Sequence, residues 1–259
     1  MRSSIALYDA LADDYDAHFD VPHRHAYDEL SWRSVAARLG PPAPGRPLVD
    51  AGCGVGRWAE RLIALGHEVV GIEQAPRMID AARARGLGAR FTLVKGSMEQ
   101  VAPPVTPVGA VLAMGSLQYA GDPAATLTRF ASWTAPGGLV AVLVDGLGSL
   151  VVELARAGRL DEAEQRRSTR SGVWSTDGRT ADLHLFDAAH LRDAMSAAGL
   201  VDIEVQGLLC GWTVYGRDRL MADLTDDPEV TLAREAAWST DPALVDMGKQ
   251  LLALGRVPG

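Results

Sequence analysis

Short apolar runs alternate with segments of helical periodicity from residue 47 onward. The runs are PLVDAG, EVVGIE, RFTLVKGS, VGAVLAMG and LVAVLV, and several are apolar at nearly every position, as strands buried on both faces of a sheet are. Between them, segments such as GRWAERLIALG repeat apolar residues at helical spacing and end at glycines. Strands and helices that alternate in this way predict an α/β domain with a mostly parallel sheet covered by helices on both sides.

Segments outside this alternation predict three additions to the sheet. Residues 5–38 carry helical apolar spacing among many charges, which predicts two N-terminal helices, and a Pro/Gly-rich stretch then leads into the sheet. Residues 147–187 predict one helix and then a hairpin around Asp177-Gly178. The alternating VDIEVQG predicts an edge strand with one exposed face, and the polar tail from about Arg217 predicts helices.

These patterns divide the chain into four parts. We expect a helical lid over residues 1–46, an α/β core over residues 47–146, and a cap insertion over residues 147–187. Residues 188–259 should supply the last helix and edge strands of the core, followed by a helical tail.

Composition and charge narrow the class of protein. The 259 residues are 47% hydrophobic and 22% charged, which is ordinary for a globular chain. A net charge of −8 argues against a broad nucleic-acid or anionic-membrane surface, although the arginines of the insertion could form a local basic patch. Two cysteines provide neither a disulfide framework nor a metal cluster, and no signal peptide or membrane span is recognisable. We expect a cytoplasmic protein without a metal.

Three glycines at alternate positions follow the first predicted strand, in LVDAGCGVGRW. Glycine at a strand-to-helix turn lets backbone N–H groups approach a ligand, and the next helix offers its positive end. A tight turn without a ligand is the alternative, but three spaced glycines exceed what a turn requires. The third glycine, Gly56, comes one residue too early for the dinucleotide fingerprint. Asp50 precedes the glycines, and Glu73 ends the next strand, where a ribose diol would lie.

This set of motifs resembles the class I S-adenosylmethionine-dependent methyltransferases over residues 47–145. The resemblance implies a Rossmann-like, doubly wound sheet of seven strands with one antiparallel strand, and the edge strand VDIEVQG agrees with it. It also implies S-adenosyl-L-methionine as cofactor. Where the family often has Asp to meet the adenine, this chain has Ser97, so that contact could fall to the Met98 backbone or to Glu99. Cys53 is expected to be a small residue beside the cofactor and not a nucleophile.

Twelve positions match cofactor contacts of that family. They are Tyr15, Asp50, Gly52, Cys53, Gly54, Glu73, Gln74, Met78, Ser97, Met98, Ala113 and Met114.

The core motifs are expected to bind the cofactor. We therefore expect the residues that bind the methyl acceptor in the segments added to the sheet. His184 and His18 are the candidates for moving a proton, although a structural role is the alternative for each histidine. Trp174, Phe186 and Trp212 are the candidates for an acceptor wall, and Trp212 could equally pack a sheet edge.

The function predicted is methyl transfer to a small molecule. The composition, rich in Ala, Arg, Gly and Pro, points to a bacterial source and to a secondary metabolite as acceptor. Two alternatives stay open: methylation of a tRNA base, and cofactor binding without methyl transfer, as in a regulator or a cyclase.

Overall fold

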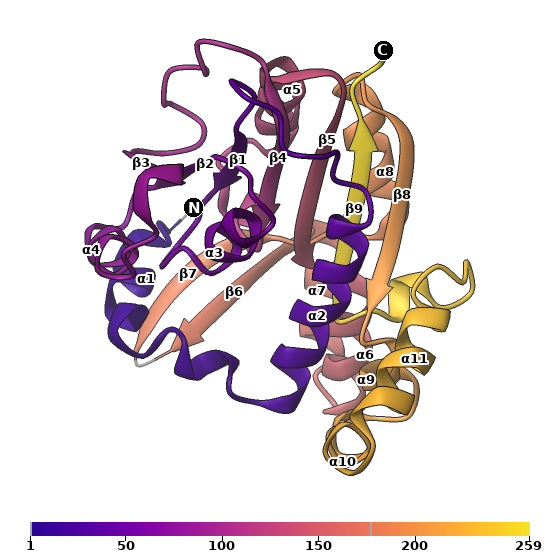
Figure 1. The fold of residues 1–259 in the computed structure, drawn as a ribbon. Helices are drawn as coiled ribbons and strands as arrows, with labels where there is room; N and C mark the ends of the chain where they lie inside the picture. The colour runs from indigo at the N-terminus through magenta and orange to yellow at the C-terminus, as the bar shows by residue number, and fades with distance from the viewer. Residues whose placement is uncertain (1, 177) are drawn as a thin grey trace.

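A seven-stranded sheet runs through the computed structural model, which describes residues 2–176 and 178–259 (Figure 1). The strand order is β3-β2-β1-β4-β5-β9-β8, and β9 is antiparallel to both of its neighbours. The strands are β1 (Leu48–Ala51), β2 (Val69–Glu73), β3 (Phe91–Lys95), β4 (Val108–Met114), β5 (Thr134–Asp145), β8 (Val201–Leu208) and β9 (Gln250–Arg256). The predicted fold class is confirmed, with β8 at the edge and β9 as the antiparallel strand.

Helices cover both faces of this sheet because the strands are apolar on both sides. On one face, α5 (Pro123–Trp133) and α8 (Ala188–Ala197) pack against β4 side chains such as Val111. On the other face, α3 (Arg57–Ala64) and α2 (Pro22–Ala36) pack against the alternate β4 side chains such as Leu112. Near the β2–β3 edge lie α4 (Pro76–Ala84) and the short η3 (Gly88–Arg90).

The N-terminal segment contains the two predicted helices, α1 (Ile5–Leu11) and α2. Two short 3₁₀ helices, η1 (Ala12–Asp14) and η2 (Ala17–Phe19), connect them. Leu7 and Leu11 of α1 are buried together with Met78 of α4, so this segment is packed onto the core.

The insertion after β5 contains two helices where the pattern predicted one. A turn with Gly158 at φ +74° separates α6 (Leu147–Arg156) from α7 (Leu160–Thr169). The predicted hairpin is present as β6 (Ser171–Thr176) and β7 (Arg179–His184), an antiparallel pair. Asp177, expected in its turn, lies outside the described residues.

The tail was predicted to be helical from about Arg217, and this is wrong for its last strand. Helices α9 (Cys210–Val214), α10 (Arg217–Asp226) and α11 (Pro228–Trp238) are followed by the 3₁₀ helix η5 (Val245–Met247), but QLLALGR then forms β9. Leucine and alanine have no preference for strands, so this run becomes a strand only because it fills the gap between β5 and β8. No helix in the described part of the chain is long and apolar enough to cross a membrane.

Candidate active site

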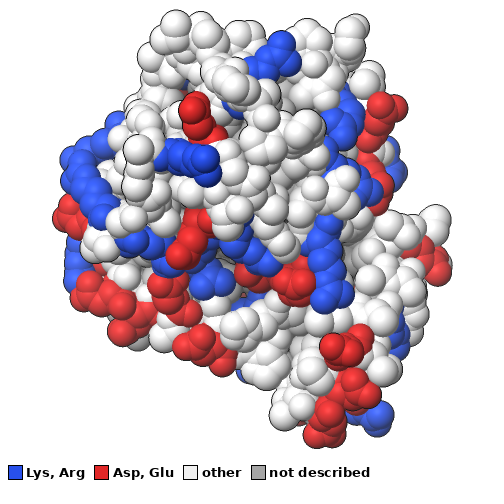
Figure 2. Space-filling model, in the orientation of Figure 1, with Lys and Arg blue, Asp and Glu red and all other residues white. Residues whose placement is uncertain are grey.

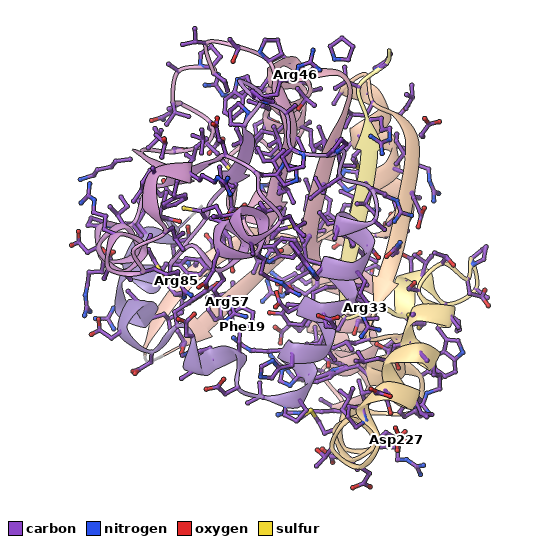
Figure 3. The ribbon with its side chains drawn as sticks, viewed as in Figure 1. Phe19, Arg33, Arg46, Arg57, Arg85 and Asp227 are labelled. Atoms are coloured by element: carbon purple, nitrogen blue, oxygen red, sulfur yellow. The ribbon has the colours of Figure 1, made fainter. Side chains whose placement is uncertain are left out.

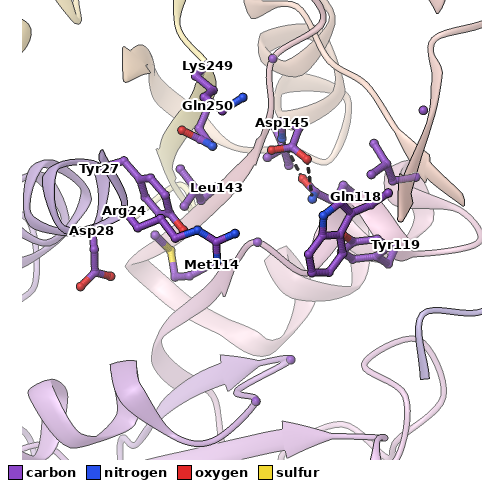
Figure 4. A pocket seen from close by; sticks show the side chains of 18 of the residues that line it. Arg24, Tyr27, Asp28, Met114, Gln118, Tyr119, Leu143, Asp145, Lys249 and Gln250 are labelled. Atoms are coloured by element: carbon purple, nitrogen blue, oxygen red, sulfur yellow. Dashed lines mark hydrogen bonds between the residues drawn. The ribbon is translucent and has the colours of Figure 1, made fainter. Parts of the chain in front are cut away.

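Two adjoining cavities open at the carboxyl ends of the strands, where ligands bind in open α/β sheets. The larger has a volume of about 430 Å³ and lies between the glycine loop, the ends of β4 and β5, α2 and the insertion (Figure 4). The smaller, of about 70 Å³, lies over the ends of β2 and β3. Residues shared by both walls join them into one site: Tyr8, Tyr15, Gly52, Gly54, Met114, Gly115 and Tyr119.

The glycine loop after β1 has the conformation that its glycines permit. Gly52 has φ +77°, and a Cβ at this position would lie 2.4 Å from the Cβ of Ser116. Gly54 has φ +53°, and a Cβ there would meet only the Tyr15 ring, at 4.0 Å. The loop therefore needs glycine at residue 52 for its own packing, whereas Gly54 leaves space on the cavity side.

Two buried carboxylates face this loop from the ends of β1 and β2. Asp50 is 2% exposed, and its Oδ2 has no hydrogen-bond partner among the described residues. Burial, followed by the nearby charge of Glu73, raises the pKa of Asp50 to about 7. Glu73 accepts hydrogen bonds from the backbone N–H groups of Gly54 at 3.0 Å, Gln74 at 2.7 Å and Ala75 at 2.8 Å. Its pKa is also raised, because burial outweighs these bonds.

The N-terminal segment is held over the loop by ion pairs and ring contacts. Arg57, at the start of α3, pairs with Asp16 at 3.4 Å and with Asp28 at 3.3 Å. Its guanidinium lies 3.9 Å from the centre of the Phe19 ring (Figure 3). Tyr15 is thereby placed against Gly54, and burial raises its pKa to about 12.

Most of the predicted cofactor residues line the two cavities. Tyr15, Asp50, Gly52, Cys53, Gly54 and Met114 line the larger one, and Glu73, Gln74, Ser97 and Met98 line the smaller one. Met78 and Ala113 are buried in the core, and neither is among the residues found to line these two cavities. Burial raises the pKa of the Cys53 thiol well above its usual range, so the thiol stays protonated, as expected of a residue that is not a nucleophile.

The histidines predicted to move a proton do not lie on the cavity wall. Leu183 and Leu185 line the larger cavity, and side chains alternate along a strand, so His184 between them points to the other face. His18 lies in η2, where its Nδ1 is 3.0 Å from the carbonyl oxygen of Asp14. The structure gives no support to a catalytic role for either histidine.

Of the three residues predicted for the acceptor wall, Trp174 lines the larger cavity. Phe186 lies in the core, 2% exposed, and its ring also stacks on the exposed His190, with ring centres 5.5 Å apart. Trp212 lies behind the wall, where its indole N–H donates to Glu153 and its ring contacts His23. Phe186 and Trp212 therefore support the site without lining it.

Several polar groups of the larger cavity were not among the predicted site residues. They come from α2, η4 (Leu117–Tyr119), the end of β5, α6 and the start of β9, and they are His23, Arg24, Tyr27, Gln118, Tyr119, Asp145, Glu153, Lys249 and Gln250 (Figure 4). Asp145 ends an apolar parallel strand. Because ligands bind at the carboxyl ends of such strands, its place in the sequence indicated a residue of the site. No local pattern marks the others.

Gln118 and Asp145 form a paired arrangement in this wall. The Gln118 side chain donates from Nε2 to Asp145 Oδ2 at 3.1 Å, and the Asp145 backbone N–H donates to Gln118 Oε1 at 2.7 Å. Burial raises the pKa of Asp145, although Lys249 and Gln118 oppose the rise. Both the position and the orientation of this carboxyl are thus fixed.

Proteins similar to this chain in sequence or fold are named as methyltransferases. Residues 48–138 match the family described as "Methyltransferase domain". This match and the seven-stranded sheet show a methyltransferase domain with a Rossmann-like fold, similar to the class I S-adenosylmethionine-dependent methyltransferases.

Individual relatives have low sequence identity to this chain. The ubiquinone biosynthesis O-methyltransferase of Xylella fastidiosa is 28% identical over 192 residues, which cover 69% of this chain and 76% of the relative. The malonyl-[acyl-carrier protein] O-methyltransferase of Serratia marcescens is 33% identical over 121 residues, which cover 46% of this chain and only 47% of the relative. The solved CcbJ methyltransferase of Streptomyces caelestis has the same fold, with a TM-score of 0.60, 18% identity and 96% of each chain covered.

S-Adenosylmethionine is the cofactor of this class, and the residues present fit it. The unpartnered Asp50 Oδ2 can accept a hydrogen bond from an ammonium group, and the space beside Gly54 admits a ligand close to the backbone. Glu73 lines the smaller cavity, where it can meet the ribose hydroxyls.

Proposed function

We propose that the chain transfers the methyl group of S-adenosylmethionine to a small molecule held in the larger cavity. The observation that carries this proposal is the enclosure of the site by segments outside the sheet. The N-terminal segment contributes Tyr8 and Tyr27 to the wall, and the insertion contributes Leu150 and Trp174. A cavity of about 430 Å³ lies in the range that proteins use for small ligands.

The cofactor would lie along both cavities, and each charged group of its amino-acid end would meet a side chain of opposite charge. Asp50 would hold the ammonium group, Arg24 the carboxylate and Glu73 the ribose diol. Arg24 is suited to this role because its side chain points into the cavity and forms no ion pair with any described residue (Figure 4).

Methyl transfer from a sulfonium is an in-line displacement in which positive charge at sulfur is lost. The protein therefore has to exclude water and align the acceptor, and it needs no metal for this step. The aromatic side chains around the cavity, among them Tyr8, Tyr119 and Trp174, can supply a dry wall.

Methylation of a tRNA base is disfavoured by the charge pairing of the insertion. Arg159 and Arg166 both pair with Glu162, and Arg167 pairs with Glu164. Blue and red side chains are likewise interspersed on the face shown in Figure 2, with no continuous basic surface there. These arginines are already neutralised, whereas RNA binding needs cations that can meet phosphates.

The test is to incubate the purified protein with methyl-labelled S-adenosylmethionine and an extract of the source organism, and to separate the products by size. Label in compounds of low molecular weight supports the proposal. Label in RNA would establish the tRNA alternative. Binding of S-adenosylhomocysteine without any transfer of label would favour a regulator or another reaction on this fold.

A further inference from the structure

One carboxylate on the acceptor side of the larger cavity forms no direct ion pair with the residues that the structure describes. Asp145 lies at the end of β5, and its carboxylate forms no ion pair with any residue in the described ranges. Lys249 and Arg24 oppose the rise of its pKa, but neither forms an ion pair with it, and Lys249 is 3.9 Å from Glu153 and 4.4 Å from the centre of the Trp212 ring. Asp145 is therefore a carboxylate with which a cationic ligand can pair directly.

Asp145 is also held in place, as a residue that recognises a ligand has to be. Its two hydrogen bonds with the buried Gln118 use Oδ2 and the backbone N–H. The Gln250 side chain also faces this carboxylate from the cavity wall and opposes the rise of its pKa. A fixed carboxylate at the wall of a cavity suits a charged donor, which would bind beside these neutral amides.

Aromatic rings surround the same space. Tyr8, Tyr119 and Trp174 all line the larger cavity, although they come from α1, η4 and β6. The Tyr8 ring centre is 5.6 Å from that of Tyr119, with the planes at 85°, and 5.7 Å from that of Trp174, with the planes at 50°. Since all three side chains line the cavity, a cation bound there would lie among electron-rich rings.

We propose that the methyl acceptor is a primary or secondary amine, which binds as its ammonium ion between Asp145 and these aromatic rings. This inference rests on the proposed function and names the acceptor class for the same site. It assigns Asp145 to binding the acceptor and to accepting its proton.

The chemistry balances with the groups present. The ammonium gives one proton to the Asp145 carboxylate, which leaves a lone pair on nitrogen. That pair attacks the methyl carbon, the N–C bond forms, and the C–S bond breaks with its electrons passing to sulfur. The products are the methylated ammonium and S-adenosylhomocysteine, and Asp145 later returns its proton to solvent.

Other acceptors fit this wall less well. An aliphatic hydroxyl is far too weak an acid to give its proton to a carboxylate, even one whose pKa burial has raised. A carboxylate acceptor needs no base, and Asp145 would repel it. The paired Lys249 and Glu153 contribute little net charge to attract such an acid.

Three ligands that share one skeleton test the inference: 2-phenylethylamine, 2-phenylethanol and 3-phenylpropionate. Their binding to the protein saturated with S-adenosylhomocysteine is measured by calorimetry or by ligand-observed NMR. We expect the amine to bind at least about tenfold more tightly than the alcohol, and the acid to bind most weakly. Equal affinities, a preference for the alcohol or the acid, or no binding of the amine would overturn the inference.

Asp145→Asn should remove the preference for the amine, and Glu153→Gln is the matched control because Glu153 lines the same cavity but is paired with Lys249. A preference that survives in Asp145→Asn would exclude Asp145 as the recognising group. The comparison of the three ligands on the unaltered protein stands even if that variant fails to fold. Transfer of label to extract compounds tests the proposed function separately, so the two can fail independently.

Discussion

Removal of the Glu73 carboxylate should weaken both the fold and the cofactor site. Its two oxygens accept three backbone N–H groups, from Gly54, Gln74 and Ala75, in a position only 8% exposed. In Glu73→Ala these donors lose their acceptor, at about 1–3 kcal/mol for each one that water does not reach. Because the adjoining cavity can admit water, we expect a total loss of about 2–4 kcal/mol, or about 5–12 °C in Tm.

Glu73→Ala should also lose more cofactor affinity than a shift of the Gly54 loop alone would cause. Two charge-assisted bonds to the ribose hydroxyls contribute about 1.5–3 kcal/mol each when water is excluded. After partial replacement by water, we expect Kd for S-adenosylhomocysteine to rise at least about tenfold, which corresponds to about 1.4 kcal/mol. Calorimetry on the purified variant measures this change, and Glu73→Gln, which retains one acceptor oxygen, should lose less stability than Glu73→Ala.

A cofactor analogue separates the two effects. The unaltered protein should prefer S-adenosylhomocysteine over its 2′,3′-dideoxy form, and Glu73→Ala should bind the two alike. Unchanged affinity in the variant would refute the assignment of the ribose to Glu73. Equal loss of affinity for both ligands would show that Glu73 acts only through the Gly54 loop.

Three further changes test the rest of the site. Asp50 has its pKa raised to about 7 and must be ionised to meet an ammonium, so affinity for S-adenosylhomocysteine should rise about tenfold from pH 6 to pH 8, and a flat calorimetric profile would contradict this. Gly52→Ala should abolish cofactor binding because its Cβ would lie 2.4 Å from the Cβ of Ser116, whereas Gly40→Ala, with nothing within 4 Å, should bind normally in the same assay. Replacement of residues 150–184 by a short Gly/Ser loop should abolish transfer of labelled methyl groups while S-adenosylhomocysteine still binds; a normal transfer rate would place acceptor recognition in the N-terminal segment.

The cofactor side was predictable because its signals are local in the sequence. Glycines at fixed spacing after an apolar run, and an acid at the end of the next strand, determine backbone geometry within a single βαβ unit. Gly52, Gly54, Asp50 and Glu73 all line the site as a result.

The acceptor side was poorly predictable because it depends on contacts distant in the sequence. His184 was chosen because a histidine can move a proton near neutral pH. A shift of one residue in the register of a strand moves each side chain to the other face, and the hydrophobic pattern did not determine the register of β6 and β7. Arg24 and Lys249 reach the cavity only because β9 pairs with β5 and α2 packs against β8 and β9. A single lysine or arginine in a polar stretch carries no sign of such a position.

The place of β9 in the sheet has a consequence for the order in which the protein forms. β8 is bonded only to β9, and β9 follows every other strand in the sequence while lying between β5 and β8. During synthesis, the apolar edge of β5 must therefore stay without its neighbour while residues 146–249 are added. An unpaired apolar edge is an opening for contact with other chains, so this interval is when nascent molecules are most exposed to aggregation or chaperone binding. Lys249 and Gln250 arrive with that strand, so the larger cavity is completed in the same event that completes the sheet.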